Sequence, residues 1–189
     1  MLPTRPDDLD RMLEEIERQN QEVRDLVAAH DADALTWRAD PSRWSVTGQI
    51  AHLVLVNGPY LKTMAETVAA QGGGNSSGPW KHPWFSRYFA NSMEPPVTRR
   101  YKTMKSMKPD PGSDPQGEAE RFFATQDQLR DVIESARGLD MGRVRFGSPF
   151  FRLFRFSLGG GLALLLAHNR RHIWLANEVV SSPGVPGRS

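Results

Sequence analysis

The spacing of apolar residues along the chain predicts four helices. In each helical stretch apolar side chains recur with a period close to 3.6 residues, so that one face of every helix can be buried. Capping residues and glycines set the ends: the second helix begins at Ser45 or Thr47, and the third ends at Gly138. Four amphipathic helices of this length favour an all-α four-helix bundle. The expected helices cover about residues 7–30, 45–71, 114–137 and 157–180.

A long connection, residues 71–113, separates the second and third predicted helices. Its ends are rich in glycine and proline, whereas aromatic residues gather between Trp80 and Phe89. Connections of this length in compact domains are often functional, so we expect a cap or lid with a short helix near residues 84–91. Strand signals are weak, because residues 144–146 alternate briefly but no segment of similar quality could pair with them.

Length and composition limit the classes of function. A chain of 189 residues, 39% apolar, has the size of one domain, which we expect at residues 1–180 with a disordered tail at 181–189. The 24 basic and 22 acidic side chains nearly balance, so the net charge of +2 demands neither nucleic acid nor an acidic membrane. The chain contains no cysteine, which excludes disulfides, thiolate metal sites and a cysteine nucleophile. Any metal ligands must therefore come from His, Asp or Glu.

The sequence carries no indication of targeting or of membrane insertion. Residues 1–10 hold prolines and charged side chains rather than an apolar segment, so no secretory signal is expected. The longest strongly apolar stretch, residues 156–167, is too short to span a bilayer. We expect a soluble cytoplasmic protein that acts on a small molecule and has no membrane partner.

Three histidines provide the strongest indication of chemistry. His168 and His172 are four residues apart, so they lie on one face of the fourth helix, within a stripe that is otherwise apolar. His52 has a similarly apolar neighbourhood on the second helix. A buried imidazole needs a partner, and three inward rings can converge on one divalent ion, for which zinc, nickel and iron are equal candidates. Three protein ligands leave coordination positions open, as catalytic sites require.

Two alternatives involve no catalysis. An inward histidine is more often a hydrogen-bonded core residue than a ligand, in which case the bundle is a scaffold. The segment Arg99–Lys108 contains five basic residues, one tyrosine and no acid, which would suit an anionic partner. Most such runs are solvated surfaces and no nucleic-acid-binding motif accompanies this one, so nucleic-acid contact is a minor alternative.

The segments that carry these histidines resemble the DinB superfamily of four-helix-bundle proteins. The resemblance rests on WSVTGQIAHL at residues 44–53 and HNRRHI at residues 168–173, and with the first and third helices it covers about residues 7–180. It implies a DinB-like bundle with a long crossover connection between helices two and three, and a homodimer. The connection at 71–113 is the part least like the family. The metal ligands implied by the resemblance are His52, His168 and His172.

The resemblance leaves the reaction open. Related proteins include transferases and isomerases that use low-molecular-weight thiols such as mycothiol, bacillithiol or glutathione, and others are described as hydrolases. It therefore implies a metal-dependent enzyme acting by thiol-dependent transfer or by hydrolysis, without selecting a substrate. A general base for hydrolysis is not evident, since no carboxylate lies between Trp44 and Tyr60 and only Glu178 follows His172.

Three further residues are candidates for supporting roles. Asn20 interrupts the apolar stripe of the first helix and Gln126 that of the third, so each could orient an imidazole or a water, unless it lies at the edge of the stripe. Arg171 could hold the carboxylates of a thiol cofactor, or it could face solvent or a partner subunit. His30 ends a helix and His82 lies in a loop, so neither is expected to be a ligand.

Overall fold

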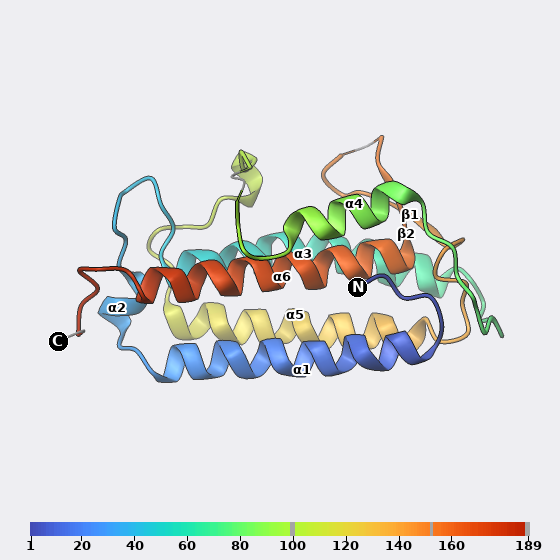
Figure 1. Cartoon of the computed structure of the whole chain (residues 1–189), viewed down its shortest axis with the longest axis horizontal. Coiled ribbons are helices and arrows are strands. Elements are labelled where there is room, and N and C mark those ends of the chain that lie inside the picture. The colour runs from blue at the N-terminus through green and yellow to red at the C-terminus, as the bar shows by residue number, and fades with distance from the viewer. Residues whose placement is uncertain (99–100, 152, 188–189) are drawn as a thin grey trace.

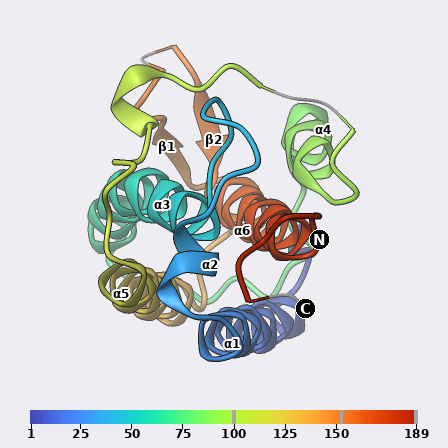
Figure 2. The same cartoon turned by 90° about the vertical axis from the view of Figure 1, so that its left-hand side faces the viewer.

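Four long helices pack side by side along the length of the molecule (Figure 1). The computed structural model describes residues 1–98, 101–151 and 153–187. Each long helix contacts two others, so that α1, α5, α3 and α6 follow one another around the bundle, as the end-on view in Figure 2 shows. The prediction of an all-α four-helix bundle is confirmed. The helices are α1 (Asp7–Ala28), α3 (Val46–Ala69), α5 (Pro115–Ser135) and α6 (Leu158–Val180).

Short polar side chains fix where three of these helices begin. Ser45 accepts a hydrogen bond from the backbone N–H of Gly48 at 3.1 Å, so Ser45 rather than Thr47 caps α3. Asp114 caps α5 and Ser157 caps α6 in the same way. Each cap satisfies a backbone donor that would otherwise lack a partner at the start of the helix. The ends read from the sequence therefore agree with the structure to within a few residues.

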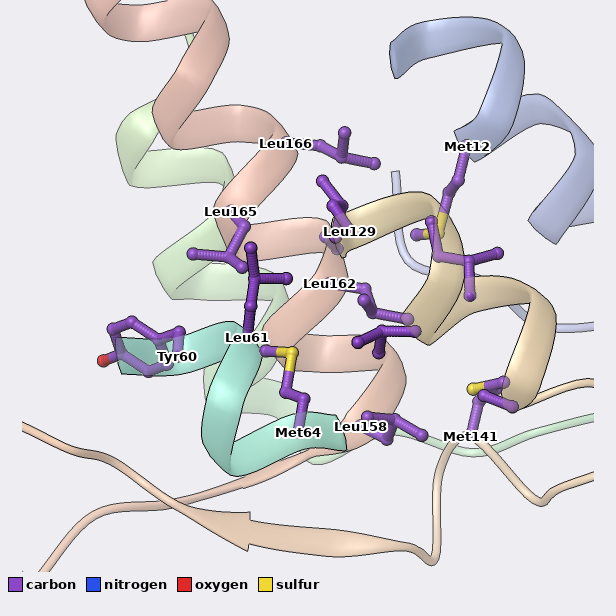
Figure 3. Close-up of a cluster of buried hydrophobic side chains, with 14 of the residues drawn as sticks. Met12, Tyr60, Leu61, Met64, Leu129, Met141, Leu158, Leu162, Leu165 and Leu166 are labelled. Atoms are coloured by element: carbon purple, nitrogen blue, oxygen red, sulfur yellow. The ribbon is translucent and has the colours of Figure 1, made fainter. Parts of the chain in front are cut away.

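Two clusters of buried apolar side chains fill the bundle. The larger one includes Leu61, Leu129, Leu162 and Met141, whose side chains point toward one another from different parts of the chain in Figure 3. The smaller one lies toward the beginning of α3 and α5 and the end of α6. Between the two clusters, buried amide side chains interrupt the apolar faces of all four long helices. They are Gln19, Asn20, Asn57, Gln126 and Asn169.

The connection from α3 to α5 crosses the outside of the bundle. Its helix α4 (Trp84–Met93) packs on the outer side of α6, and the 3-10 helix η1 (Lys105–Met107) contacts α3 (Figure 2). The short helix expected near residues 84–91 is thus present. Another short helix, α2 (Ala32–Thr36), joins α1 to α3. That the connection acts as a lid stays a prediction.

A small antiparallel hairpin precedes α6 and corrects one expectation from the sequence. Strands β1 (Arg145–Gly147) and β2 (Arg155–Ser157) pair with Phe146 opposite Phe156, although no partner was expected for residues 144–146. Both phenylalanines are buried, with ring centroids 6.0 Å apart. Each strand is three residues long, too short for the alternation to stand out in the sequence.

The segment that follows α6 bears on the domain boundary expected from the sequence. The described chain continues beyond α6 to residue 187, and Val185 in this stretch is buried. The division into residues 1–180 and a tail stays a prediction.

Across the described residues, none of the helices combines the length and the apolar character needed to cross a membrane.

Candidate metal centre

The structure brings the three histidines singled out from the sequence into one cluster. His52 comes from α3, and His168 and His172 come from consecutive turns of α6. One ring nitrogen from each histidine lies within 4.8 Å of the others. The ring centroids are 4.5 to 5.2 Å apart. The spacing of four residues on α6, together with the contact between α3 and α6, is sufficient to place all three rings around one point.

Burial keeps these rings neutral. His52 and His172 are 4% and 7% exposed, and burial lowers the pKa of both, that of His172 well below its usual value. His168 retains some exposed area, but its enclosure, aided by the neighbouring His52 and Arg171, lowers its pKa to about 3. A neutral imidazole keeps a lone pair on one nitrogen. The cluster is therefore a set of nitrogen donors at neutral pH.

Hydrogen bonds select which nitrogen carries that lone pair in two of the rings. The Nδ1 atom of His52 donates to the backbone carbonyl of Met107 at 2.7 Å. The Nδ1 atom of His172 donates to the side-chain oxygen of Gln49 at 2.6 Å. Since Nδ1 carries the hydrogen in both rings, Nε2 is left as the donor of electrons. Metal-binding histidines commonly have this outer partner, which fixes the tautomer and the orientation of the ring.

The third ring has a polar atom without a protein partner. The Nδ1 atom of His168 is buried, and no group among the described residues forms a hydrogen bond with it. A buried polar atom left without a partner costs free energy, so such atoms usually mark a bound water, ion or ligand. The ring of His168 lies 5.2 Å from that of His52 and 4.6 Å from that of His172, centroid to centroid, and the residues present therefore fit a bound cation.

One aromatic side chain packs against the cluster and another against the neighbouring Arg171. Trp44, directly before the cap of α3, lies with its ring centroid 4.7 Å from that of His52 and stacks on His172 at 6.0 Å. Tyr101 lies under the guanidinium of Arg171, whose carbon is 5.3 Å from the ring centre. Tyr101 and the Met107 carbonyl both belong to the crossover connection. That connection therefore passes over the histidines.

Some of these contacts could not be found in the sequence. Gln49 stands inside the family-like segment, but its role depends on reaching His172 across the bundle. The contribution of Met107 is a backbone carbonyl, which no side-chain pattern reveals. Trp44 stands in the family-like segment and Tyr101 in the basic segment, but neither pattern indicates which side chain each ring contacts.

The supporting residues expected from the sequence have different positions. Gln126 donates to Gln19 at 3.3 Å and accepts from Asn169 at 2.9 Å, so it holds the residue that follows His168 rather than a ring. The Oδ1 atom of Asn20 is buried and has no hydrogen-bond partner among the described residues. Arg171 is buried and close enough to lower the pKa of His168 and of His172.

The two remaining histidines lie in other surroundings. His30 donates from Nδ1 to the carbonyl of Leu26 at 2.9 Å, within the end of α1. His82 contacts the hydroxyl of Ser157 and the carbonyl of Pro3, at the far end of α6. In the basic segment Arg99–Lys108, Lys102, Lys105 and Lys108 are exposed, whereas Arg99 and Arg100 lie outside the described residues. A nucleic-acid contact there stays a prediction.

Comparison with known proteins gives one match, to a family model. The family model of the DinB superfamily matches residues 15–176, which is most of the chain and includes all three clustered histidines. The searches of curated proteins and of solved structures found no match.

Proposed function

The chain belongs to the DinB superfamily, and we propose on this basis that it is a metal-dependent enzyme in which His52, His168 and His172 bind one divalent transition-metal ion. The observation that carries the proposal is the convergence of three buried imidazoles, with one nitrogen of each within 4.8 Å of the others. Imidazole is a common ligand of zinc, nickel and iron alike, so the donor set fits each of them. Three nitrogen donors also leave coordination positions for a reactant.

The surroundings of the cluster support thiol-dependent transfer to a small molecule better than hydrolysis. When bound, the ion would supply Lewis acidity, which lowers the pKa of a coordinated thiol or water. Arg171 adds positive charge beside the rings and favours an anionic thiolate. Trp44 packs against the rings of His52 and His172 and shields that side of the cluster from solvent. Hydrolysis would also need a general base, and among the described residues no Asp or Glu belongs to the cluster.

Two carboxylates on neighbouring elements are already engaged. Arg170 donates to Glu15 at 2.8 Å and forms a two-pronged contact with Glu94. Because Arg170 holds both carboxylates in hydrogen bonds, neither is free to accept a proton from a water. This arrangement again favours the thiol reaction. Hydrolysis is the second candidate, and a homodimer stays a prediction from the family resemblance.

Metal content tests the site directly. Protein purified without a histidine tag and reconstituted separately with zinc, nickel and iron(II) should hold about one equivalent of at least one metal by elemental analysis. His52→Ala and His168→Ala should each hold less than about a tenth of an equivalent. His30→Ala is the matched control and should bind as the unaltered protein does. Equal metal content in all four proteins, or none in any, would contradict the proposal.

A second assay separates the two reactions. The metal-loaded protein is incubated with an electrophile in the presence and absence of small thiols, including glutathione, mycothiol and bacillithiol. Thiol-dependent transfer predicts consumption of the electrophile that depends on thiol concentration and is lost in His52→Ala. A rate that is independent of every thiol but needs the metal would assign hydrolysis instead. A protein that binds metal yet consumes no electrophile under either condition would match a non-catalytic binding bundle.

A further inference from the structure

A second surface, formed by α4 and the loop of the hairpin, exposes large apolar side chains. Soluble proteins seldom expose a continuous apolar area of this kind without a function. The side chain most exposed is that of Leu153, in the hairpin loop, with 95% of its area accessible. We call the group the aromatic patch. Its members are Trp84, Tyr88, Phe151, Leu153 and Phe154, each between 45% and 95% exposed.

Ring contacts make the patch continuous. Trp84 contacts Tyr88 with centroids 6.5 Å apart, and Tyr88 contacts Phe89 at 5.8 Å. Phe89 bridges to the hairpin, 6.2 Å from Phe154, which contacts Phe151 at 5.9 Å. The rings therefore run without a break from α4 to the hairpin loop. Figure 1 shows these two segments next to each other, and in Figure 2 both lie on the outside of the bundle.

The hairpin presents basic side chains on its outer face. Phe146 and Phe156 face the core, and side chains alternate along a strand, so Arg145 and Arg155 point away from it. Both arginines are exposed, and the pairing of Arg155 with Gly147 places them diagonally on the same face. The two arginine side chains therefore point into solvent on either side of the apolar loop.

The charge around the aromatic patch has a single sign. Residues 79–93 and 141–157, which carry the patch, contain no aspartate or glutamate. The acids next to these segments, Asp140 and Glu94, face Arg143 and Arg170 respectively. Exposed basic residues in the described part of the two segments are Lys81, Arg87, Arg143, Arg145 and Arg155. The charge of this surface is therefore complementary to that of an anionic partner.

We propose that the aromatic patch binds peripherally to an anionic lipid surface. Trp and Tyr side chains favour the boundary between headgroups and acyl chains, apolar side chains such as Leu153 insert more deeply, and nearby arginines attract acidic headgroups. A second copy of the chain fits less well, because a symmetric contact would bring the cationic patches together. A single-stranded nucleic acid would stack on the rings but would gain nothing from the exposed Leu153.

The proposal differs from the sequence-based expectation that no membrane is a partner. That expectation rested on the lack of a spanning segment, and a peripheral contact needs none. It is also independent of the metal centre, because the patch lies on α4 and the β hairpin, whereas the histidines lie near the start of α3 and in the middle of α6.

Vesicle co-sedimentation tests the proposal. The full chain is mixed with vesicles of phosphatidylcholine alone and with vesicles containing about a third phosphatidylserine, at low salt. Binding is expected to the anionic vesicles and to weaken as salt rises. Leu153→Ser should reduce partitioning about tenfold, and Arg145→Ser with Arg155→Ser about fivefold per arginine. Failure of the unaltered protein to bind anionic vesicles overturns the proposal.

Matched variants guard against non-specific effects. Leu55→Ser removes another exposed leucine, and Arg38→Ser with Arg43→Ser removes the same charge at the opposite end of the bundle. Both controls should bind vesicles as the unaltered protein does. If they lose binding to the same extent as the patch variants, the surface assignment is wrong. Loss of self-association, or of binding to poly(U) RNA, in Leu153→Ser without any vesicle binding would assign the patch to a second copy or to nucleic acid and also overturn the proposal.

Discussion

At the scale of single residues, the metal centre depends on the protonation of three rings that the bundle keeps out of water. Burial alone favours the neutral form of each ring, and neighbouring positive charge favours it further. The partners of His52 and His172 then determine which nitrogen stays free. The three neutral rings are therefore already arranged as metal ligands in the metal-free protein. Keeping the rings neutral costs the folded protein free energy, relative to the unfolded chain, when the solution becomes acidic.

This cost predicts a pH dependence of stability in the metal-free protein. The pKa of His168 is lower in the folded state, about 3, than its usual 6.5, so on acidification the unfolded chain takes up the proton first. The stability is therefore complete above the usual pKa and is lost as pH falls toward the folded value. Between pH ~7 and pH ~5 we expect the free energy of unfolding to fall by up to about 2 kcal/mol from this ring. Urea unfolding across this range measures the fall.

The control for the pH experiment is a substitution that removes the titrating group. His168→Leu should have a smaller fall in the free energy of unfolding over the same range, because neither state then binds the proton. His30→Leu, at a partly exposed ring outside the cluster, should keep most of the fall. An identical pH profile in His168→Leu and in the unaltered protein would contradict the explanation.

A second prediction at this scale concerns the partner of His172. Gln49→Leu removes the oxygen that accepts from Nδ1, so the ring can rotate or adopt the other tautomer. We expect metal affinity to fall about 10- to 100-fold with the fold intact, measured by competition with a chelating dye. Gln21→Leu, an exposed glutamine on α1, should leave the affinity unchanged. Unchanged affinity in Gln49→Leu would show that the hydrogen bond does not orient the ligand.

At the scale of elements, the start of α6 is unusual because three consecutive glycines occupy a buried part of a helix. Glycine is a poor helix former, so its presence there needs a compensating reason. A Cβ atom on Gly161 would lie 2.4 Å from a ring carbon of Phe146 and 2.6 Å from the end of Met64. The glycine therefore allows β1 and α3 to approach the helix. The close contact positions the hairpin and, with it, the aromatic patch.

The same contact predicts the effect of a single methyl group. Gly161→Ala should destabilise the protein by about 1–3 kcal/mol, because Phe146 or Met64 must move out of a packed position. Gly147→Ala is the matched control, since a Cβ there meets nothing within 4 Å. Its effect should stay within about 0.5 kcal/mol. Chemical denaturation of both variants gives the comparison, and an equally stable Gly161→Ala would show that the helix start has room to spare.

Elements differ in how well the sequence predicted them, for physical reasons. Helices such as α5 carry their signal locally, in a cap at Asp114 and an apolar stripe, and their bounds were close to those observed. The hairpin depends on Phe146 meeting Phe156 across a loop, and three paired residues leave no local pattern. The Met107 carbonyl depends on the path of the whole crossover connection. Both features depend on how distant segments meet in the folded chain, which no local pattern in the sequence records.

At the scale of the whole molecule, the buried amides divide the core into two apolar clusters. Asn169 donates to Gln19 at 3.0 Å and to Gln126 at 2.9 Å, and accepts from Asn57 at 3.0 Å. One side chain of α6 thus joins all four long helices. Because His168 precedes Asn169, this network fixes the rotation of α6 at the level of the metal centre. Buried polar networks of this kind specify one arrangement among several that an apolar core would allow.

The histidine cluster could be predicted from the sequence because its three members lie on regular helices with readable apolar faces and in segments that resemble the DinB superfamily. The amide network could be predicted only in part: Asn20 and Gln126 interrupt apolar stripes, but the partner of each depends on the order of helices around the bundle. The reaction could not be predicted, since it depends on the groups that the crossover connection brings to the histidines, such as Tyr101 and the carbonyl of Met107, and the path of that connection leaves no pattern in the sequence.

Metal binding should stabilise the whole molecule, because the three ligands join α3 to α6. A ligand that binds only the folded state at about 100 times its dissociation constant adds about 2.7 kcal/mol to the free energy of unfolding. For a chain of this size that corresponds to a rise of about 5–10 °C in Tm. Thermal unfolding with and without metal measures the rise. His30→Ala should keep this rise in Tm. His52→Ala removes the ligand on α3 and His168→Ala removes a ligand on α6, and each should lose the rise. A rise that persists in both variants would place the ion elsewhere on the protein, since neither remaining pair of histidines could hold α3 and α6 together as tightly as the full set.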